Sequence, residues 1–314
     1  MHNKNVFLKI LIKLFLLFII VFILDFLTGS LLKKLYFQQK TGQEYKLNNT
    51  IEKVNADILI FGSSTASHDY SPAVFEKLLH KSCYDVGLPG SSIFYHYAIL
   101  SAMIKRYHPQ TVLLNFDMQE FKKEAIFYDR LSVLLPYYKK HPEVDSIVNL
   151  KSSHERLKLF SKIYPYNSLI YKLITDNNEV TKKDDEENNG YIPLSQLWDQ
   201  KIKNCSSLFL DYEVDTSKIK VYEGFIKKCI ENKIQLYIFS SPIFCNYDTS
   251  KSIVIGRQIA NKYKIKFFDY SKDSLFLDNQ HLFSNTIEHL NDSGAKIFSK
   301  KIISDISAKS RNDY

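Results

Sequence analysis

The chain has 314 residues, 45% of them hydrophobic and 14% aromatic, with only 9 Gly and 8 Pro. This composition excludes a linker-rich or disordered protein, and the length suffices for one α/β domain with an insertion. The formal net charge is +8. Because the Lys residues are spread along the whole chain, without zinc-finger spacing or an RNP-like aromatic motif, we expect no nucleic-acid partner.

An apolar segment near the N-terminus predicts a transmembrane helix. Residues 14–24 are unbroken apolar sequence, preceded by Lys4, Lys9 and Lys13. This run is shorter than the roughly 20 residues that span a bilayer, but snorkelling of Lys9 and Lys13 extends the usable helix to 6–27. Basic residues before the segment predict a cytoplasmic N-terminus and an extracytoplasmic remainder.

Two other interpretations of this segment are weaker. A cleaved signal peptide would require an A-x-A-like exit, which residues 25–30 do not provide. A buried core helix would not be hydrophobic all round. We therefore expect a single-pass anchor at 1–32, in the cytoplasmic membrane of the cell. A polar and aromatic stalk is expected at 33–55.

Short apolar runs then alternate with helical segments over residues 56–314. The runs that read as strands are 58–61, 83–86, 111–116, 235–239 and 265–268. The segments that read as helices are 71–79, 92–107, 217–232, 250–263 and 293–307. Strands alternating with helices predict an α/β domain, a three-layer doubly wound parallel sheet that binds its ligand beyond the carboxyl ends of the strands.

Residues 118–216 interrupt this alternation. They read as helices and loops, and we interpret them as a mostly helical insertion. Within them, residues 181–190 form a charged run that is most simply a solvated, mobile loop.

The four cysteines are Cys83, Cys205, Cys229 and Cys245. None forms a CxxC pair, so we expect no metal site. Their positions do not show whether any two are bridged, and the burial tendency of free Cys favours four buried thiols. The chain has no P-loop or GxGxxG motif. We therefore expect no nucleotide or other cofactor.

Two motifs suggest catalysis. Gly62-Ser63-Ser64 directly follows the first strand, and His289-Leu290-Asn291 precedes the last helix. Each alone is more often a turn or a surface histidine. Together they can meet at one edge of the sheet, as a serine nucleophile and its base. His68, His96 and His281 are expected to be ordinary polar residues.

The order of these motifs resembles the SGNH (GDSL-like) hydrolase superfamily, across the predicted domain outside the insertion. The resemblance implies a flavodoxin-like fold, with Ser64 as the nucleophile and His289 as the base. It also implies an oxyanion hole built from the N–H groups of Ser64 and Gly90, which lies in the similar stretch Val86-Gly87-Leu88-Pro89-Gly90-Ser91. The arrangement is similar to membrane-anchored members that act on acyl groups of cell-surface polymers.

Two positions depart from the family pattern. Thr286 stands where the family has the Asp that orients the histidine, and Glu288, Asp278 and Asp292 are candidate substitutes. In the third block, the family's Gly-x-Asn-Asp is replaced by the residues from Asn115 to Gln119. Asn115 and Gln119 are therefore the candidate third oxyanion donors.

Two functions follow as hypotheses. The first is a membrane-anchored esterase or O-acyltransferase that acts on acyl esters of a cell-envelope glycan or glycolipid. The second is a non-catalytic accessory protein that keeps the fold, binds glycan or assists a membrane acyltransferase. The two departures favour the second.

Overall fold

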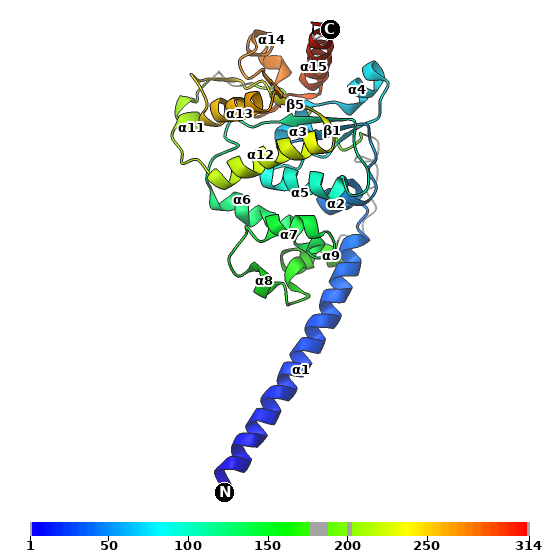
Figure 1. Cartoon of the computed structure of the whole chain (residues 1–314), viewed down its shortest axis with the longest axis vertical. Helices are drawn as coiled ribbons and strands as arrows, with labels where there is room; N and C mark the ends of the chain where they lie inside the picture. The colour runs from blue at the N-terminus through cyan, green and yellow to red at the C-terminus, as the bar shows by residue number, and fades with distance from the viewer. Residues whose placement is uncertain (1, 176–187, 200–202, 313–314) are drawn as a thin grey trace.

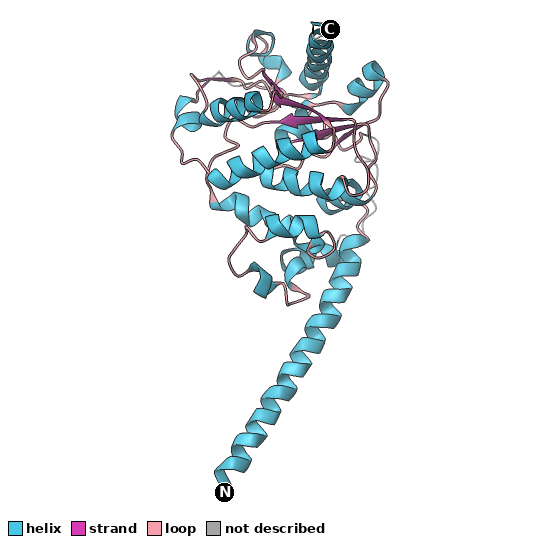
Figure 2. Cartoon of the chain, viewed as in Figure 1, coloured by secondary structure: helices cyan, strands magenta, loops and turns pink. Residues whose placement is uncertain are grey.

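The computed structural model describes residues 2–175, 188–199 and 203–312. A parallel sheet carries helices on both faces, and one long helix projects from the domain (Figures 1 and 2). The expected α/β class with a parallel sheet is thus confirmed.

The sheet has five parallel strands in the order β2-β1-β3-β5-β7. They are β1 (Ile58–Phe61), β2 (Cys83–Asp85), β3 (Thr111–Asn115), β5 (Gln235–Ser240) and β7 (Lys266–Asp269). The chain runs from β1 outward to β2 and then back to β3 on the other side of β1. Such a reversal opens a crevice at the carboxyl ends of β1 and β3, where doubly wound sheets bind ligands.

Side chains alternate between the two faces of the sheet, as the period of a strand requires. Leu59 and Phe61 of β1 belong to one buried apolar cluster, and Ile58 and Ile60 belong to a second. Helices α5 (Ile93–Met103), α12 (Thr216–Glu231) and α13 (Lys251–Lys262) contribute to the first cluster. Helices α3 (Ser64–Asp69), α4 (Pro72–Leu79), α14 (Ser274–Leu277) and α15 (Asp292–Asn312) contribute to the second.

Helix α1 (His2–Phe37) is the one helix in the described part of the chain that is long and apolar enough to cross a membrane. Its apolar side chains from Val6 to Leu27 are exposed along the helix, Phe18 by 67%. At its other end, Leu32 and Tyr36 are buried in the domain core. The long apolar helix is therefore continuous with the folded domain.

The segment expected to be a stalk, 33–55, belongs to the domain instead. Its helix α2 (Gly42–Glu52) buries Leu47 and Ile51 in the same cluster as Tyr36. These few apolar residues are spaced along one face of α2, so a mostly polar segment still packs as a core helix.

The insertion is a series of short helices that lie mostly on the side of the domain from which α1 emerges, while its last helix lies beside α13 (Figure 1). They are α6 (Ala125–Asp129), η1 (Arg130–Tyr137), α7 (Pro142–Val148), α8 (Glu155–Lys158), η2 (Tyr164–Leu169), α9 (Ile170–Thr175) and α11 (Ser206–Leu210). Buried Leu134, Tyr137 and Val148 join the cluster beneath α5. Of the charged run expected to be a mobile loop, residues 181–187 lie outside the described residues.

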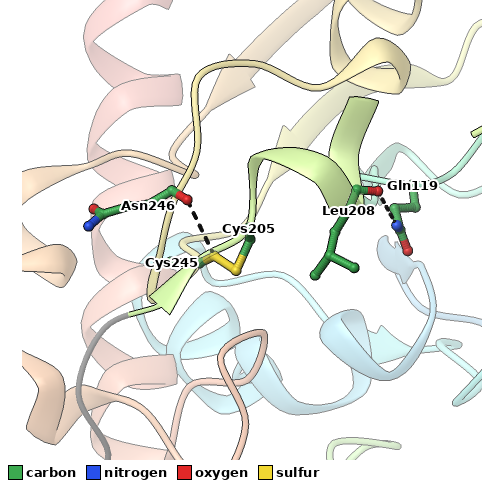
Figure 3. The surroundings of a disulfide bond; sticks show 5 residues. All are labelled: Gln119, Cys205, Leu208, Cys245 and Asn246. Atoms are coloured by element: carbon green, nitrogen blue, oxygen red, sulfur yellow. Dashed lines mark hydrogen bonds between the residues drawn. A yellow bond between two sulfur atoms is a disulfide. The ribbon is translucent and has the colours of Figure 1, made fainter. Parts of the chain in front are cut away.

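A disulfide joins the end of the insertion to the loop after β5. Cys205 is bonded to Cys245, with Cα atoms 6.1 Å apart (Figure 3). The short strands β4 (Lys203–Asn204) and β6 (Cys245–Asn246) pair beside it. The prediction of four free thiols is therefore wrong for this pair, while Cys83 and Cys229 are free and buried. The bridged residues are 40 positions apart, so only the fold brings them together.

Candidate active site

The turn after β1 places Ser64 at the crevice between β1 and β3. Gly62 packs so closely that a Cβ there would lie 2.6 Å from the Cβ of Ala66 and 2.8 Å from the Cβ of Asn115. Only glycine therefore lets α3 start directly against the end of β3. Ser63 is the N-cap of α3 and Ser64 is its first residue, partly exposed.

The loop that carries His289 packs against α3. Leu290 donates its backbone N–H to Oδ1 of Asp69, the last residue of α3, at 2.9 Å. The His289 ring lies 4.9 Å, centroid to centroid, from the ring of His68. His68 is one helical turn after Ser64, so both side chains lie on the same face of α3. The two residues predicted to be catalytic thus come from adjoining segments.

The electrostatic state of His289 differs from that of a complete triad. Burial, and then the neighbouring His68, lower the pKa of His289 to about 4. The ring is therefore neutral at physiological pH, and the lowered pKa makes it a weaker base than an ordinary histidine. Its Nδ1 is buried and has no hydrogen-bond partner among the described residues. In a triad, a carboxylate at this nitrogen would orient the ring and stabilise the imidazolium.

No side chain of the candidate orienting residues makes a hydrogen bond to Nδ1 of His289 in the described part of the chain. Thr286 and Asp278 are exposed. Asp292 forms an ion pair with Lys296 at 2.6 Å and accepts a hydrogen bond from the Tyr191 hydroxyl. Glu288 lies beside the crevice and lines its cavity.

A cavity of about 240 Å³ lies at the carboxyl ends of β1, β3 and β5. Its walls include four residues that the sequence singled out, namely Gly90, Asn115, Gln119 and Glu288. Ser63 and Thr65, the neighbours of Ser64, also line it. Ser64 and His289 are not among the described residues that line this cavity, so the predicted pair lies next to it.

Gly90 is a candidate oxyanion donor through its backbone N–H group. No hydrogen bond from this N–H is present among the described residues. Its φ is +72°, and a Cβ would lie 1.2 Å from Nη1 of Arg130. The left-handed backbone conformation therefore favours glycine at this position, whereas the Arg130 guanidinium is the end of a flexible side chain.

The two amide side chains are already engaged. Asn115 accepts hydrogen bonds from Tyr70 and Ser241, both at 2.8 Å, and donates to Asp117 at 2.8 Å. Gln119 donates through Nε2 to the carbonyl of Leu208 (Figure 3). Each amide therefore uses one of its two N–H donors in a structural contact.

Sequence reasoning missed a group of charged residues that line the cavity. Asp117 accepts hydrogen bonds from Ser63 and Thr65 in addition to Asn115, while burial raises its pKa. Lys218 is fully buried, and its Nζ makes no hydrogen bond within the described chain and lies 3.4 Å from the Phe127 ring centroid.

Glu120 completes this group. It accepts the N–H of Ile93 at 2.7 Å, and burial raises the pKa of Glu120 and lowers that of Lys218. The sequence holds no signal for these roles, because a buried charge and a solvated one have the same local pattern.

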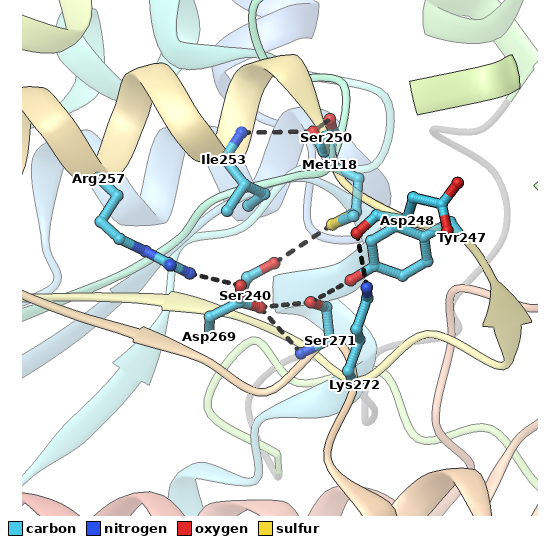
Figure 4. Close-up of polar contacts among 10 residues, drawn as sticks. All are labelled: Met118, Ser240, Tyr247, Asp248, Ser250, Ile253, Arg257, Asp269, Ser271 and Lys272. Atoms are coloured by element: carbon cyan, nitrogen blue, oxygen red, sulfur yellow. Dashed lines mark hydrogen bonds and ion pairs between the residues drawn. The ribbon is translucent and has the colours of Figure 1, made fainter. Parts of the chain in front are cut away.

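Polar residues at the ends of β5 and β7 serve the fold (Figure 4). Ser240 donates to the Met118 sulfur at 3.7 Å, and Arg257 of α13 pairs with Asp269 of β7 at 2.6 Å. Ser250 caps α13 by accepting the N–H of Ile253. These side chains therefore make structural contacts at this edge of the sheet.

Within the described residues, no three His, Cys, Asp or Glu side chains gather in a way that could hold a metal ion. Comparison with protein-family models and with curated protein sequences gives no match to this chain. The inference of function therefore rests on the geometry of this site.

Proposed function

We propose that the protein is an exported, membrane-anchored esterase or O-acyltransferase of the SGNH type. The observation that carries the proposal is the contact between α3, which begins at Ser64, and the His289 loop. This contact adjoins a cavity that contains Gly90.

In this mechanism His289 accepts the proton of the Ser64 hydroxyl while Oγ attacks the acyl carbonyl carbon. The N–H groups of Ser64 and Gly90 hold the resulting oxyanion. The ester C–O bond then breaks, and the leaving alcohol takes the proton from His289. Water or a sugar hydroxyl attacks the acyl-serine in the reverse sequence, which gives hydrolysis or transfer.

Location outside the cytoplasm is supported by the Cys205–Cys245 disulfide, because disulfides persist in oxidising compartments. The Lys residues before the apolar segment agree with a cytoplasmic N-terminus. Retention of α1 as an anchor, rather than cleavage as a signal peptide, is supported by the burial of Leu32 and Tyr36 in the domain core. Cleavage after these residues would remove both side chains from that core.

The proposed substrate is an acyl ester of a cell-envelope glycan or glycolipid. A second cavity of about 360 Å³ shares Gly90 and Arg130 with the first and extends to Tyr36 at the end of α1. Its walls include apolar Leu131 and Leu169. A substrate with an apolar part could thus reach the site from the side of the anchor.

Replacement of the nucleophile tests the proposal. We expect Ser64→Ala to lower ester hydrolysis and acyl transfer on envelope glycans by about 10²–10⁴-fold, because the base then has no hydroxyl to activate. Activity is measured on the full-length protein in detergent, with folding checked by circular dichroism. Ser63→Ala is the matched variant. A loss in Ser63→Ala with full activity in Ser64→Ala would contradict the assignment.

The accessory function is the second candidate. It is favoured by the unpartnered Nδ1 of His289, the exposed Thr286 and the Asp117 carboxyl group in the cavity. The carboxyl group, when ionised, would oppose an oxyanion nearby. A fluorophosphonate probe distinguishes the two functions: labelling at Ser64 supports the enzyme. Glycan binding without labelling supports an accessory protein, including one that assists a membrane acyltransferase.

A further inference from the structure

The tip of the insertion is attached to α1 near the end of its apolar segment. Asp25 accepts hydrogen bonds from the Ser161 hydroxyl at 2.5 Å and from the backbone N–H of Lys162 at 2.7 Å. Gly29 of α1 approaches Lys162 so closely that a Cβ would lie 2.3 Å from its carbonyl carbon. The loop between α8 and η2 is therefore held at the level of residues 25–29 of α1.

Residues 25–29 of α1 lie at the expected edge of a bilayer. A hydrocarbon core of about 30 Å is spanned by about 20 helical residues. The exposed apolar side chains of α1 extend from Val6 to Leu27. Asp25, as a charged residue near the end of this stretch, is suited to the interface rather than to the hydrocarbon.

Large apolar side chains are exposed on α8 and in the loop after it, and again on α9, which follows η2. On the α8 side, Leu157 is 63% exposed and Phe160 is 75% exposed. On α9, Tyr171 is 82% exposed and Ile174 is 59% exposed. Single exposed apolar residues are common, but four within twenty residues, beside a transmembrane helix, form a surface that water does not favour.

The charges around this surface suit phospholipid headgroups. The segment 150–175 carries Lys151, Arg156, Lys158, Lys162 and Lys172. Its acidic residue is Glu155, which is buried and accepts from the Ser152 hydroxyl. Lys158 also pairs with Glu155, and Lys172 pairs with Glu44. Arg156 and Lys162 are exposed, and cations at this position attract anionic lipid.

We propose that residues 155–175, here called the insertion tip, lie in the interface of the bilayer that α1 crosses. Leu157 and Phe160 then enter the boundary between headgroups and acyl chains, and the basic residues contact phosphate groups. Figure 1 shows α8 and α9 at the end of the domain that faces the N-terminal part of α1. The inference rests on insertion of α1 and is independent of the proposed catalytic chemistry.

Contact with lipid is tested by tryptophan quenching on the full-length chain. The natural Trp198, which is buried, is first replaced by phenylalanine (Trp198→Phe). Phe160→Trp is then introduced, and the protein is reconstituted in vesicles of phosphatidylcholine and phosphatidylglycerol. Part of the phosphatidylcholine is brominated near the start of its acyl chains. We expect the Phe160→Trp variant to lose most of its fluorescence in brominated vesicles.

Two further variants serve as controls. Phe18→Trp reports whether α1 is inserted, and lipid brominated deep in the acyl chains should quench it. Leu275→Trp lies on α14, at the far end of the domain in Figure 1, where Leu275 is 44% exposed. We expect it to be unaffected by brominated lipid.

Quenching of Phe160→Trp and Phe18→Trp without quenching of Leu275→Trp supports the proposal. An unquenched Phe160→Trp variant overturns it, whether α1 is inserted or not. Equal quenching of Phe160→Trp and Leu275→Trp also overturns it, because lipid contact would then not be confined to the insertion tip.

Discussion

Burial decides the state of the histidines around the site. His96 of α5 is fully buried, and both of its ring nitrogens lack hydrogen-bond partners among the described residues. Burial, and then Lys218, lower the pKa of His96 to about 3. His68 instead has a partner, since its Nδ1 lies 2.7 Å from the carbonyl of Ile192. His68, expected to be an ordinary polar residue, packs directly on His289.

The state of His96 predicts an acid-sensitive fold. Because its pKa is about 3 in the folded state and about 6.5 in the unfolded state, the unfolded chain binds more protons between these values. Stability is therefore fully present above about pH 6.5 and decreases as the pH falls toward 3. We expect His96→Leu to raise the free energy of unfolding by about 1–3 kcal/mol at neutral pH. In the His96→Leu variant, the free energy of unfolding should also decrease less between neutral pH and about pH 5 than it does in the parent.

Denaturant unfolding in detergent, at neutral pH and at about pH 5, measures the effect of His96→Leu on stability. His281→Leu is the control, because His281 is exposed and the change should stay within about 0.5 kcal/mol. A His96→Leu variant that is less stable than the parent at both pH values would show that the imidazole has a stabilising partner.

At the scale of elements, α3 is the part that assembles the site. It follows β1 without a loop, presents Ser64 and His68 on one face, and ends at Asp69. Asp69 is fully buried and holds the N–H of Leu290, 221 residues further along the chain. This carboxyl group is thus one of the contacts that position His289, together with the N–H of Ser284, which donates to the His289 carbonyl at 2.8 Å.

Asp69 is therefore predicted to be a positioning residue. Burial raises the pKa of Asp69 well above its usual range, which favours the neutral form of the carboxyl group. We expect Asp69→Asn, which retains an oxygen acceptor, to keep most of the activity. Asp69→Ala leaves the Leu290 N–H unpaired, and should cost about 1–3 kcal/mol of stability and lower kcat by displacing His289.

Steady-state kinetics and denaturant unfolding on both variants measure these effects. Equal inactivation by Asp69→Asn and Asp69→Ala, with Asp69→Asn still fully stable, would show that the carboxyl group takes part in the chemistry rather than holding the loop.

The whole molecule is a domain built onto its own apolar helix. The end of α1, helix α2 and the insertion share one core with the helices beneath the sheet. The second cavity extends from the site to Tyr36 within this junction. The separate anchor, stalk and domain expected from composition are therefore one continuous structure in which the site adjoins the helix.

The disulfide stabilises this assembly by closing a 40-residue span. We expect the double change Cys205→Ser and Cys245→Ser to lower the free energy of unfolding by about 2–4 kcal/mol, because the unfolded chain gains freedom. Thiol titration checks the bond itself. The denatured, unreduced chain should show only the thiols of Cys83 and Cys229, and reduction should expose all four. Four reactive thiols before reduction would contradict the bridge.

The positions of the five strands could be read from the sequence, because short apolar runs bounded by turns have few alternatives in an α/β chain. The predicted run 58–61 coincides with β1, and 111–116 exceeds β3 by one residue. The long apolar helix and the helical character of the insertion were likewise visible, since backbone periodicity is a local property.

Contacts between distant segments were decided by tertiary structure alone. The sequence singled out Ser64, Gly90 and His289, but not that Asp69 holds the His289 loop or that His68 packs on its ring. It also did not distinguish buried Lys218 from a solvated lysine, or the bridged cysteines from the free ones. The physical reason is that burial, and hence pKa and pairing, depends on what surrounds a side chain in space, whereas helix and strand patterns depend on neighbours along the chain.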